Sequence, residues 1–139
     1  MRRFLIAAAW ALVVTPGYAQ GAPTLTAAAE QARRAWFAHD AAALVAGSPK
    51  LVVQLPGANP SAALEPVQAA VLIADYLAPA QEVATVVSAA REMDGGLGYV
   101  ELRRRYRVAG TQEVREQSLL LGYRQGRTGW QLVELRVVG

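Results

Sequence analysis

Few side chains in this sequence have the chemistry that acid–base catalysis needs. His39 is the only histidine, and the neighbouring Asp40 could orient it as a general base. Asp75 directly precedes Tyr76, a pair that could supply a base and a phenolic hydrogen-bond donor. Adjacent side chains rarely aim at one substrate atom, and helical spacing puts Asp75 with Gln68 on a polar side. His39 and Asp75 are the catalytic candidates by residue type. Their positions argue against catalysis, and we expect His39 at the surface or a helix cap and Asp75 in solvent.

The densest charge in the chain is the run Arg-Arg-Arg-Tyr-Arg at 103–107, which could bind a polyanion. Because alternate side chains of a strand face opposite sides, Arg103, Arg105 and Arg107 would share one face. We expect that face to be solvated and its guanidinium groups to pair with acids on neighbouring strands: Glu113, Glu116 or Glu134. A paired, solvated face is a poor binding patch, so the run predicts no nucleic-acid partner.

Arg104 falls on the opposite, apolar face of this strand, where an unpaired guanidinium would be costly. It must find an acid, a group of carbonyls or the carboxylate of a ligand. One hypothesis is that Arg104, with Tyr106 and Tyr123, contributes polar groups to a ligand-binding interior. Trp36 and Trp130 would be core residues or line that interior. The alternative, which we prefer from the sequence, places Arg104 at an edge from which its side chain extends to water.

The sequence lacks the motifs of nucleophilic catalysis, phosphate binding and metal binding. It has no G-x-S-x-G nucleophile motif, no glycine-rich phosphate loop between a strand and a helix, and no histidine pair at metal-ligand spacing. The absence of cysteine excludes thiol catalysis and thiolate metal sites. The glycines at 94–98 belong to a hairpin turn, because strands are predicted on both sides. We therefore predict no cofactor and no metal site.

Residues 1–19 have the pattern of a secretory signal peptide. Met1-Arg2-Arg3 is a charged start, an apolar run follows at 4–14, and small residues before Gln20 suit cleavage after Ala19. The apolar run is too short to span a bilayer as a helix, so we expect no stable membrane anchor and a bacterial protein that is periplasmic or secreted. Cleavage lowers the net charge from +3 to +1, because two arginines leave with the signal. The basic character therefore belongs mainly to the export signal.

The remaining residues, 20–139, are predicted to form one α+β domain, with helices in the first half and strands in the second. Thr26 and Asp40 are candidate caps for two helices, and Pro66 fits the first turn of a third helix that ends before Pro79. One apolar face of that third helix should contact the core: Val67, Ala70, Val71, Ala74 and Leu77. A short strand is expected at 51–55, and an antiparallel meander at 82–90, 97–108, 113–124 and 129–138. The three helices should pack on one face of a curved sheet.

Several segments of the chain follow a pattern known from one superfamily. They are Phe-Ala-His-Asp-Ala-Ala-Ala-Leu at 37–44, the third helix at 66–77 and Gly-Trp-Gln-Leu-Val at 129–133. With them, the chain resembles the nuclear-transport-factor-2-like superfamily, also called cystatin-like or SnoaL-like. Gly-Tyr-Val-Glu-Leu at 98–102 and Leu-Gly-Tyr-Arg at 121–124 look most like its small exported bacterial proteins of unknown function. The resemblance implies a cone-shaped fold whose open end can hold a small apolar ligand.

Three classes of function remain, since this superfamily contains isomerases, dehydratases, binding modules and interaction domains. The first is an exported non-catalytic module that holds a small apolar or amphipathic molecule in its cone. The second is an interaction domain that uses the convex strand face to form a homodimer or to bind an envelope protein. The third is a small isomerase- or dehydratase-like enzyme with an acid–base residue in the cone. We favour the non-enzymatic classes because no acid–base pair is predicted to point inward.

Overall fold

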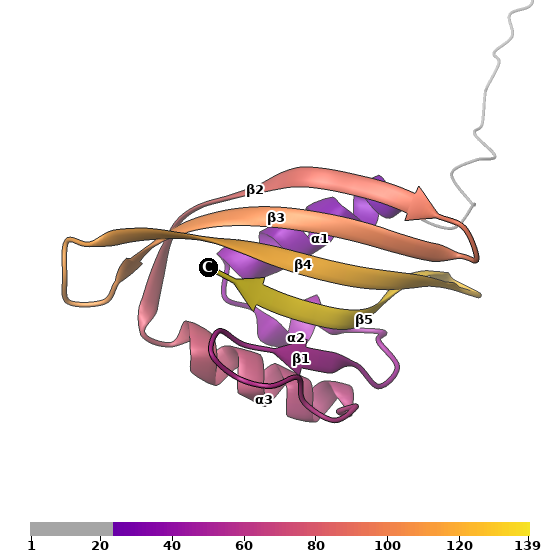
Figure 1. Ribbon diagram of the computed structural model, residues 1–139, viewed down its shortest axis with the longest axis horizontal. Helices are drawn as coiled ribbons and strands as arrows, with labels where there is room; N and C mark the ends of the chain where they lie inside the picture. Colours follow the sequence, from indigo (N-terminus) through magenta and orange to yellow (C-terminus); the bar gives the residue numbers. More distant parts are fainter. Residues whose placement is uncertain (1–23) are drawn as a thin grey trace, which may run out of the picture.

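Residues 24–139 form an α+β fold in the order that the sequence predicts (Figure 1). The computed structural model describes these residues, and its elements are α1 (Leu25–Phe37), α2 (Ala41–Leu44), β1 (Val52–Gln54), α3 (Pro66–Leu77), β2 (Ala80–Met93), β3 (Leu97–Val108), β4 (Val114–Gly126) and β5 (Gly129–Val138). The predicted signal peptide and its cleavage site lie outside the described residues. Between residues 24 and 139, no helix combines the length and the apolar character that crossing a bilayer requires.

The strands form one curved sheet in the order β1-β5-β4-β3-β2, with the helices packed on it (Figure 1). The four strands from β2 to β5 pair antiparallel, as predicted, because short turns join each strand to the next. In the turn between β2 and β3, Gly95 and Gly96 take φ angles of 83° and 73°, which glycine adopts without steric cost. β1 pairs parallel with β5 at the other edge of the sheet. The fold class expected from the sequence is confirmed.

The first helix begins at Leu25, two residues before its predicted start. Its cap is Thr24, whose hydroxyl accepts a hydrogen bond from the backbone N–H of Ala27 at 3.1 Å. The prediction that Thr26 caps this helix is wrong, because Thr26 already lies in the first turn. The buried side of α1 includes Trp36, as the apolar spacing predicts. The helix therefore delivers a large aromatic ring to the interior of the fold.

Of the predicted core face of α3, Leu77 is buried as expected, but Val67, Val71 and Ala74 are exposed. Ala69, Ile73 and Leu77 are the buried residues of this helix, whereas Val67 and Val71 are 76% and 58% exposed. The spacing of apolar residues could not decide between these faces, because α3 carries one charged residue among its 12 and is apolar on nearly every side. The helix consequently presents an apolar face to the core and a second apolar face to the outside.

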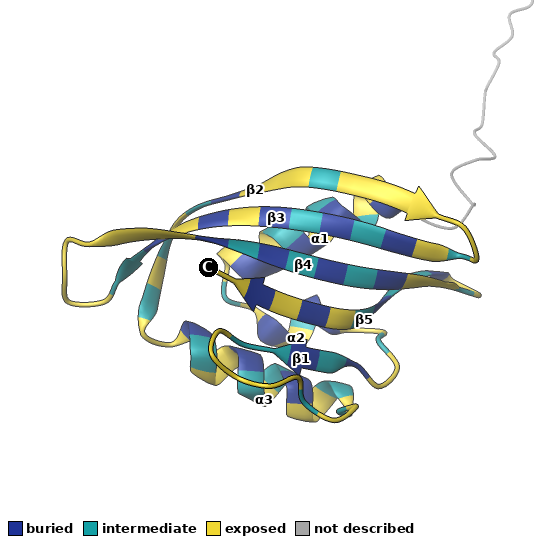
Figure 2. Cartoon of the chain, viewed as in Figure 1, coloured by how far each residue is buried: buried dark blue, intermediate teal, exposed yellow. Residues whose placement is uncertain are grey.

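The core lies between the sheet and the helices, where the buried residues of these elements gather (Figure 2). Its largest apolar side chains are at most 1% exposed: Trp36, Leu51, Ile73, Leu77, Leu102, Leu119, Leu121 and Leu135. Arg104 is buried among them, also at 1% exposure. A guanidinium at that depth requires polar partners, and these partners define the polar part of the interior.

Candidate functional site

Arg104 is buried beside the carboxylate of Glu82. Its Nε donates to Glu82 Oε2 at 3.2 Å and its Nη2 donates to Glu82 Oε1. The side chains of Arg104 and Glu82 are 1% and 2% exposed. This bidentate ion pair supplies the acid that a buried guanidinium needs. The expectation that Arg104 extends to water from an edge is therefore wrong, since β3 lies between β2 and β4 and has no free edge.

Uncharged groups complete the surroundings of the Arg104 guanidinium. Nη1 donates to the side-chain oxygen of Gln117 at 3.0 Å, and the Tyr76 hydroxyl donates to the same oxygen at 3.0 Å. The guanidinium carbon lies 5.1 Å and 3.9 Å from the ring centres of Trp36 and Tyr106, which is within the range of cation–π attraction. Burial raises the pKa of Tyr76, although its hydrogen bond to Gln117 acts the other way. We call the set of mutually bonded polar side chains the buried cluster: Tyr76, Glu82, Arg104 and Gln117.

Sequence reasoning missed Glu82 because of an irregularity in β2. Thr85 is paired with Arg104 and Glu82 is paired with Tyr106, but the register shifts between Glu82 and Ala84. Strict alternation counted from the inward-facing Thr85 would turn Glu82 to the outer face, whereas the bulge turns both inward. The signal that could have found Glu82 was the need of Arg104 for an acid, since the sequence offers few acids on adjacent strands.

His39 lies at the edge of the buried cluster, at the junction between α1 and α2. Its φ of 57° is in the left-handed region, and its N–H donates to the carbonyl of Trp36 at 2.9 Å while that of Asp40 donates to Ala35 at 2.8 Å. This is a Schellman motif, in which glycine usually takes the left-handed position. The ring is 27% exposed, and Nε2 lies 3.2 Å from Glu82 Oε1. His39 is thus a helix-end residue, as expected, but its carboxylate partner is Glu82.

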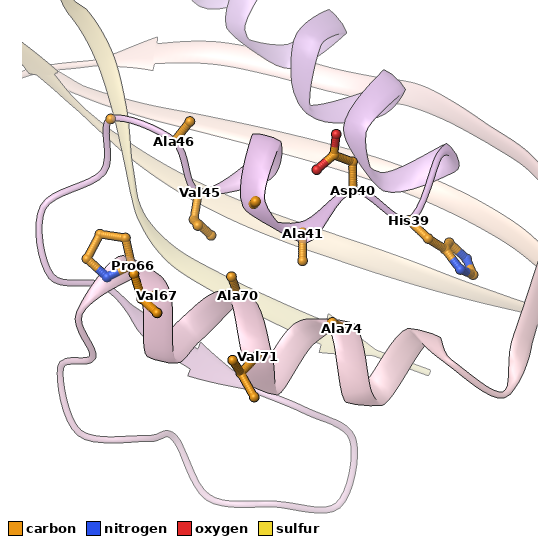
Figure 3. Close-up of a pocket in the computed structure, with 12 residues that line it drawn as sticks. His39, Asp40, Ala41, Val45, Ala46, Pro66, Val67, Ala70, Val71 and Ala74 are labelled. Carbon is orange, nitrogen blue, oxygen red and sulfur yellow. The ribbon is translucent and has the colours of Figure 1, made fainter.

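Asp40 caps α2 and does not orient His39. Its carboxylate accepts the backbone N–H of Ala43 at 3.0 Å and so caps α2, as predicted. In Figure 3 the carboxylate points away from α3, while the methyl group of Ala41 points toward it. The two neighbours at the junction therefore serve separate sites, His39 beside the buried cluster and Asp40 at the start of α2.

A groove of about 480 Å³ lies between α2 and α3, outside the core (Figure 3). Its walls are made of small apolar side chains, among them Ala41, Val45, Val67, Ala70, Val71 and Ala74. His39 lies at one end of the groove and Pro66 at the other (Figure 3). Most of the face of α3 that the sequence assigns to the core lines this groove instead. The structure therefore has an open apolar site where no functional residue was predicted except His39.

Tyr123 and Trp130 lie apart from Arg104. They line a hollow of about 70 Å³ that α1 and α2 share with the sheet. Tyr123 pairs with Gly98 at the start of β3, and Trp130 of β5 pairs with Gln125 at the end of β4. Arg104 pairs with Gln117 toward the other ends of β3 and β4. Tyr123 is 5% exposed, and burial raises its pKa far above that of a free tyrosine. The five ligand-binding candidates are thus divided, because Trp36 and Tyr106 surround Arg104 while the other two do not.

The remaining charged candidates lie at the surface. Asp75 is exposed on α3, as expected. On the outer face of the sheet, Glu116 pairs with Arg105 at 3.5 Å and with Arg103 at 4.0 Å, which agrees with the predicted cross-strand pairing. Within residues 24–139, no three His, Cys, Asp or Glu side chains form a group that could hold a metal ion. The chemistry of the described chain is thus concentrated in the buried cluster and the groove.

No protein-family model and no curated protein matches the chain. Solved structures do match. A ketosteroid isomerase-like protein from Erwinia carotovora atroseptica is 16% identical, with a TM-score of 0.65 over 81% of this chain and 91% of that protein. An NTF2-like protein with a cystatin-like fold from Novosphingobium aromaticivorans is 15% identical, with a TM-score of 0.57 over 79% and 75% of the two chains.

A third structure is that of a protein with a ketosteroid isomerase-like fold from Catenulispora acidiphila, in complex with trimethylamine. It is 12% identical, with a TM-score of 0.65 over 84% of this chain and 87% of that protein. At such low identities these similarities establish the fold and do not carry an activity across.

Proposed function

We propose that this chain, which has the nuclear-transport-factor-2-like fold, is a non-catalytic module that binds a small apolar or amphipathic molecule in the groove between α2 and α3. The observation that carries the proposal is the groove itself, an open site of about 480 Å³ with almost wholly apolar walls. That volume falls within the range of roughly 300–1,000 Å³ typical of small-molecule sites. The proposed ligand is of the class expected from the sequence, but the proposed binding site is the groove and not the interior of the cone.

The buried cluster supports a non-catalytic reading of the interior. The Glu82 carboxylate accepts hydrogen bonds from His39, Thr85 and two nitrogens of Arg104. A carboxylate held by so many donors has no free position for a substrate proton, and Trp36 and Tyr106 cover the guanidinium. Stabilisation of the fold is the role that best fits the buried cluster.

The outer face of α3 supports an occupant for the groove. A helix that is apolar on nearly every side is normally covered on every side. Val67 and Val71 are instead 76% and 58% exposed, on the face that lines the groove. Covering these side chains with an apolar molecule would remove their surface from water, at roughly 25 cal/mol for each Å². The Catenulispora protein, solved with trimethylamine, is a precedent for a small molecule on this fold.

The proposal is tested by fluorescence titration with the neutral probe N-phenyl-1-naphthylamine. We expect saturable binding by the purified protein and its loss in Ala70→Trp, because the indole would occupy part of the groove between α2 and α3. Ala27→Trp, at an exposed position on α1, is the matched control and should bind like the unsubstituted protein. Equal binding by the Ala70→Trp variant, with an unchanged melting temperature, would exclude the groove as the binding site.

A second candidate function is an isomerase- or dehydratase-like activity, and the observation that favours it is the bond between His39 Nε2 and Glu82. A carboxylate that orients an imidazole at the end of an apolar groove is an arrangement used in general-base catalysis. Proton abstraction beside a carbonyl can be followed as deuterium incorporation into 2-tetralone in heavy water. Incorporation that exceeds the buffer rate and disappears in His39→Asn would replace the binding proposal with the catalytic one.

We also propose that the protein acts outside the cytoplasm, on the strength of the signal-peptide pattern at 1–19. Cell fractionation and the intact mass of the exported form test this. The expected mature chain begins at Gln20, and a cytoplasmic product that retains Met1 would refute the export proposal without affecting the groove.

A further inference from the structure

His39 is the polar end of an otherwise apolar groove. Of the residues that line the groove, only His39 and Asp40 have polar side chains. The Asp40 carboxylate is occupied in capping α2 and points away from α3 (Figure 3). A molecule that fills the groove therefore meets one polar side chain, the imidazole of His39.

The hydrogen bond to Glu82 determines which nitrogen of His39 carries the proton. The Glu82 carboxylate forms a bidentate ion pair with Arg104 and is therefore an acceptor. His39 Nε2, at 3.2 Å from Glu82 Oε1, must be the donor. In the neutral ring, Nδ1 then carries a lone pair, and within residues 24–139 the only hydrogen bond of this ring is the one made by Nε2. Nδ1 is thus an acceptor left for a group outside the described chain.

The backbone at His39 gives independent support for a role of its side chain. The left-handed conformation favours glycine at this position of a Schellman motif, because a side chain there is sterically unfavourable. An imidazole is nevertheless present, and it is 27% exposed. The backbone alone would favour glycine, so the imidazole is present for the contacts of its side chain, of which the bond to Glu82 uses only Nε2.

The charge around the groove restricts the class of ligand further. None of the lining residues is Lys or Arg, and the one charged side chain among them is the carboxylate of Asp40. An anionic ligand would find no counter-charge in the groove, and burying its charge there would be unfavourable. The walls therefore suit an uncharged body.

We infer that the groove selects small neutral apolar molecules that carry a hydrogen-bond donor, such as a phenol or an apolar alcohol, and that His39 Nδ1 accepts that donor. The inference rests on the proposed binding function of the same groove and adds its specificity. His39 is the specificity-determining residue, and Glu82, which sets the tautomer of the ring, is a positioning residue.

Calorimetric titration with 1-naphthol and 1-methoxynaphthalene tests the inference, since the two molecules share an apolar body and differ in the donor. One net hydrogen bond corresponds to about a fivefold preference for 1-naphthol. His39→Gly suits the backbone conformation of this site and removes the ring, so it should bind the two molecules equally. Equal affinities in the unsubstituted protein would overturn the inference and leave the binding function intact, whereas binding of neither molecule would overturn both.

Nitrogen NMR of the unsubstituted protein gives a second test that needs no variant. His39 is the only histidine, so its imidazole gives a single set of nitrogen resonances. We expect the proton on Nε2 and a shift of the Nδ1 resonance when 1-naphthol, but not 1-methoxynaphthalene, is added. A proton on Nδ1 in the free protein, or identical responses to the two molecules, would overturn the inference.

Discussion

The buried cluster and the groove are opposites in composition and in position. The buried cluster places charged groups in the core, and each of them has a partner, as the ion pair between Arg104 and Glu82 shows. The groove places apolar groups at the surface, where Val67 and Val71 have no cover within the described chain. Buried charges that pair with one another are accounted for by a structural role. An exposed apolar patch is instead typical of a surface that binds a ligand or another protein. For the function proposed above, the contrast teaches that the more unusual residues, those of the buried cluster, are a poorer guide than the exposed apolar side chains of α3.

The largest effect should come from breaking the ion pair of the buried cluster. We expect Arg104→Leu and Glu82→Leu to lower the free energy of unfolding by about 3–5 kcal/mol each, because each leaves a buried charge without its partner. The double variant should be destabilised by less than the sum, since it leaves neither charge. Urea denaturation measures all three. Additive losses, or an unchanged Arg104→Leu variant, would mean that the pair does not stabilise the interior.

The next effect compares the two faces of α3. Ile73→Ala should cost about 2–5 kcal/mol of unfolding free energy, because Ile73 is fully buried and the change leaves a cavity. Val71→Ala, two residues away on the groove side of α3, should change the free energy of unfolding by no more than about 0.5 kcal/mol. Chemical denaturation of the two variants gives the comparison. A loss at Val71 as large as that at Ile73 would show that the groove is covered in the free protein.

Alkaline pH tests how dry the interior is at Tyr123. Burial raises the pKa of Tyr123 in the folded protein above the unfolded value of 10.0. The folded state therefore holds the proton more tightly, so the stability contribution is complete below pH 10 and is lost as the pH rises above it. The loss should approach about 1.4 kcal/mol per pH unit for one such group, with Tyr76 acting in the same direction.

Unfolding free energies measured between pH 8 and pH 11.5 check this expectation. Tyr123→Phe removes the ionisable hydroxyl and should flatten the decline above pH 10. A decline of the same slope in Tyr123→Phe would place the responsible groups elsewhere in the molecule.

The smallest effect concerns the cap that holds the groove wall. Asp40→Ala should lower the free energy of unfolding by about 1 kcal/mol, because the backbone N–H of Ala43 loses its acceptor. Asp40→Asn keeps an acceptor and is the matched control. Thermal melts and probe titrations of both variants provide the readout, and an Asp40→Ala variant as stable as Asp40→Asn would contradict the capping role.

Much of the fold could be predicted because its signals are local. The predicted strand limits at 97–108 and 129–138 agree with those of β3 and β5, since alternation and glycine-containing turns are properties of neighbouring residues. The cap of α2 by Asp40 and the place of Arg104 on the apolar face of its strand follow from the same kind of information. The fold class needed little more than the order of these elements.

The sites were harder to predict because they depend on distant residues and on exceptions to periodicity. Glu82 faces inward through a bulge, and the residue that bulges cannot be identified from alternation alone. His39 contacts Glu82 although 43 positions of the sequence separate them, and no local sequence pattern predicts that contact.

By itself, then, the sequence determined the order of the elements, the helix cap at Asp40 and the need of Arg104 for a partner, since each depends on residues close together in the chain. Only the tertiary structure decided that this partner is Glu82 and that one apolar face of α3 is left outside the core. The physical reason is that α3 has apolar side chains on two faces but the core can cover one of them, and that choice is made by packing between elements.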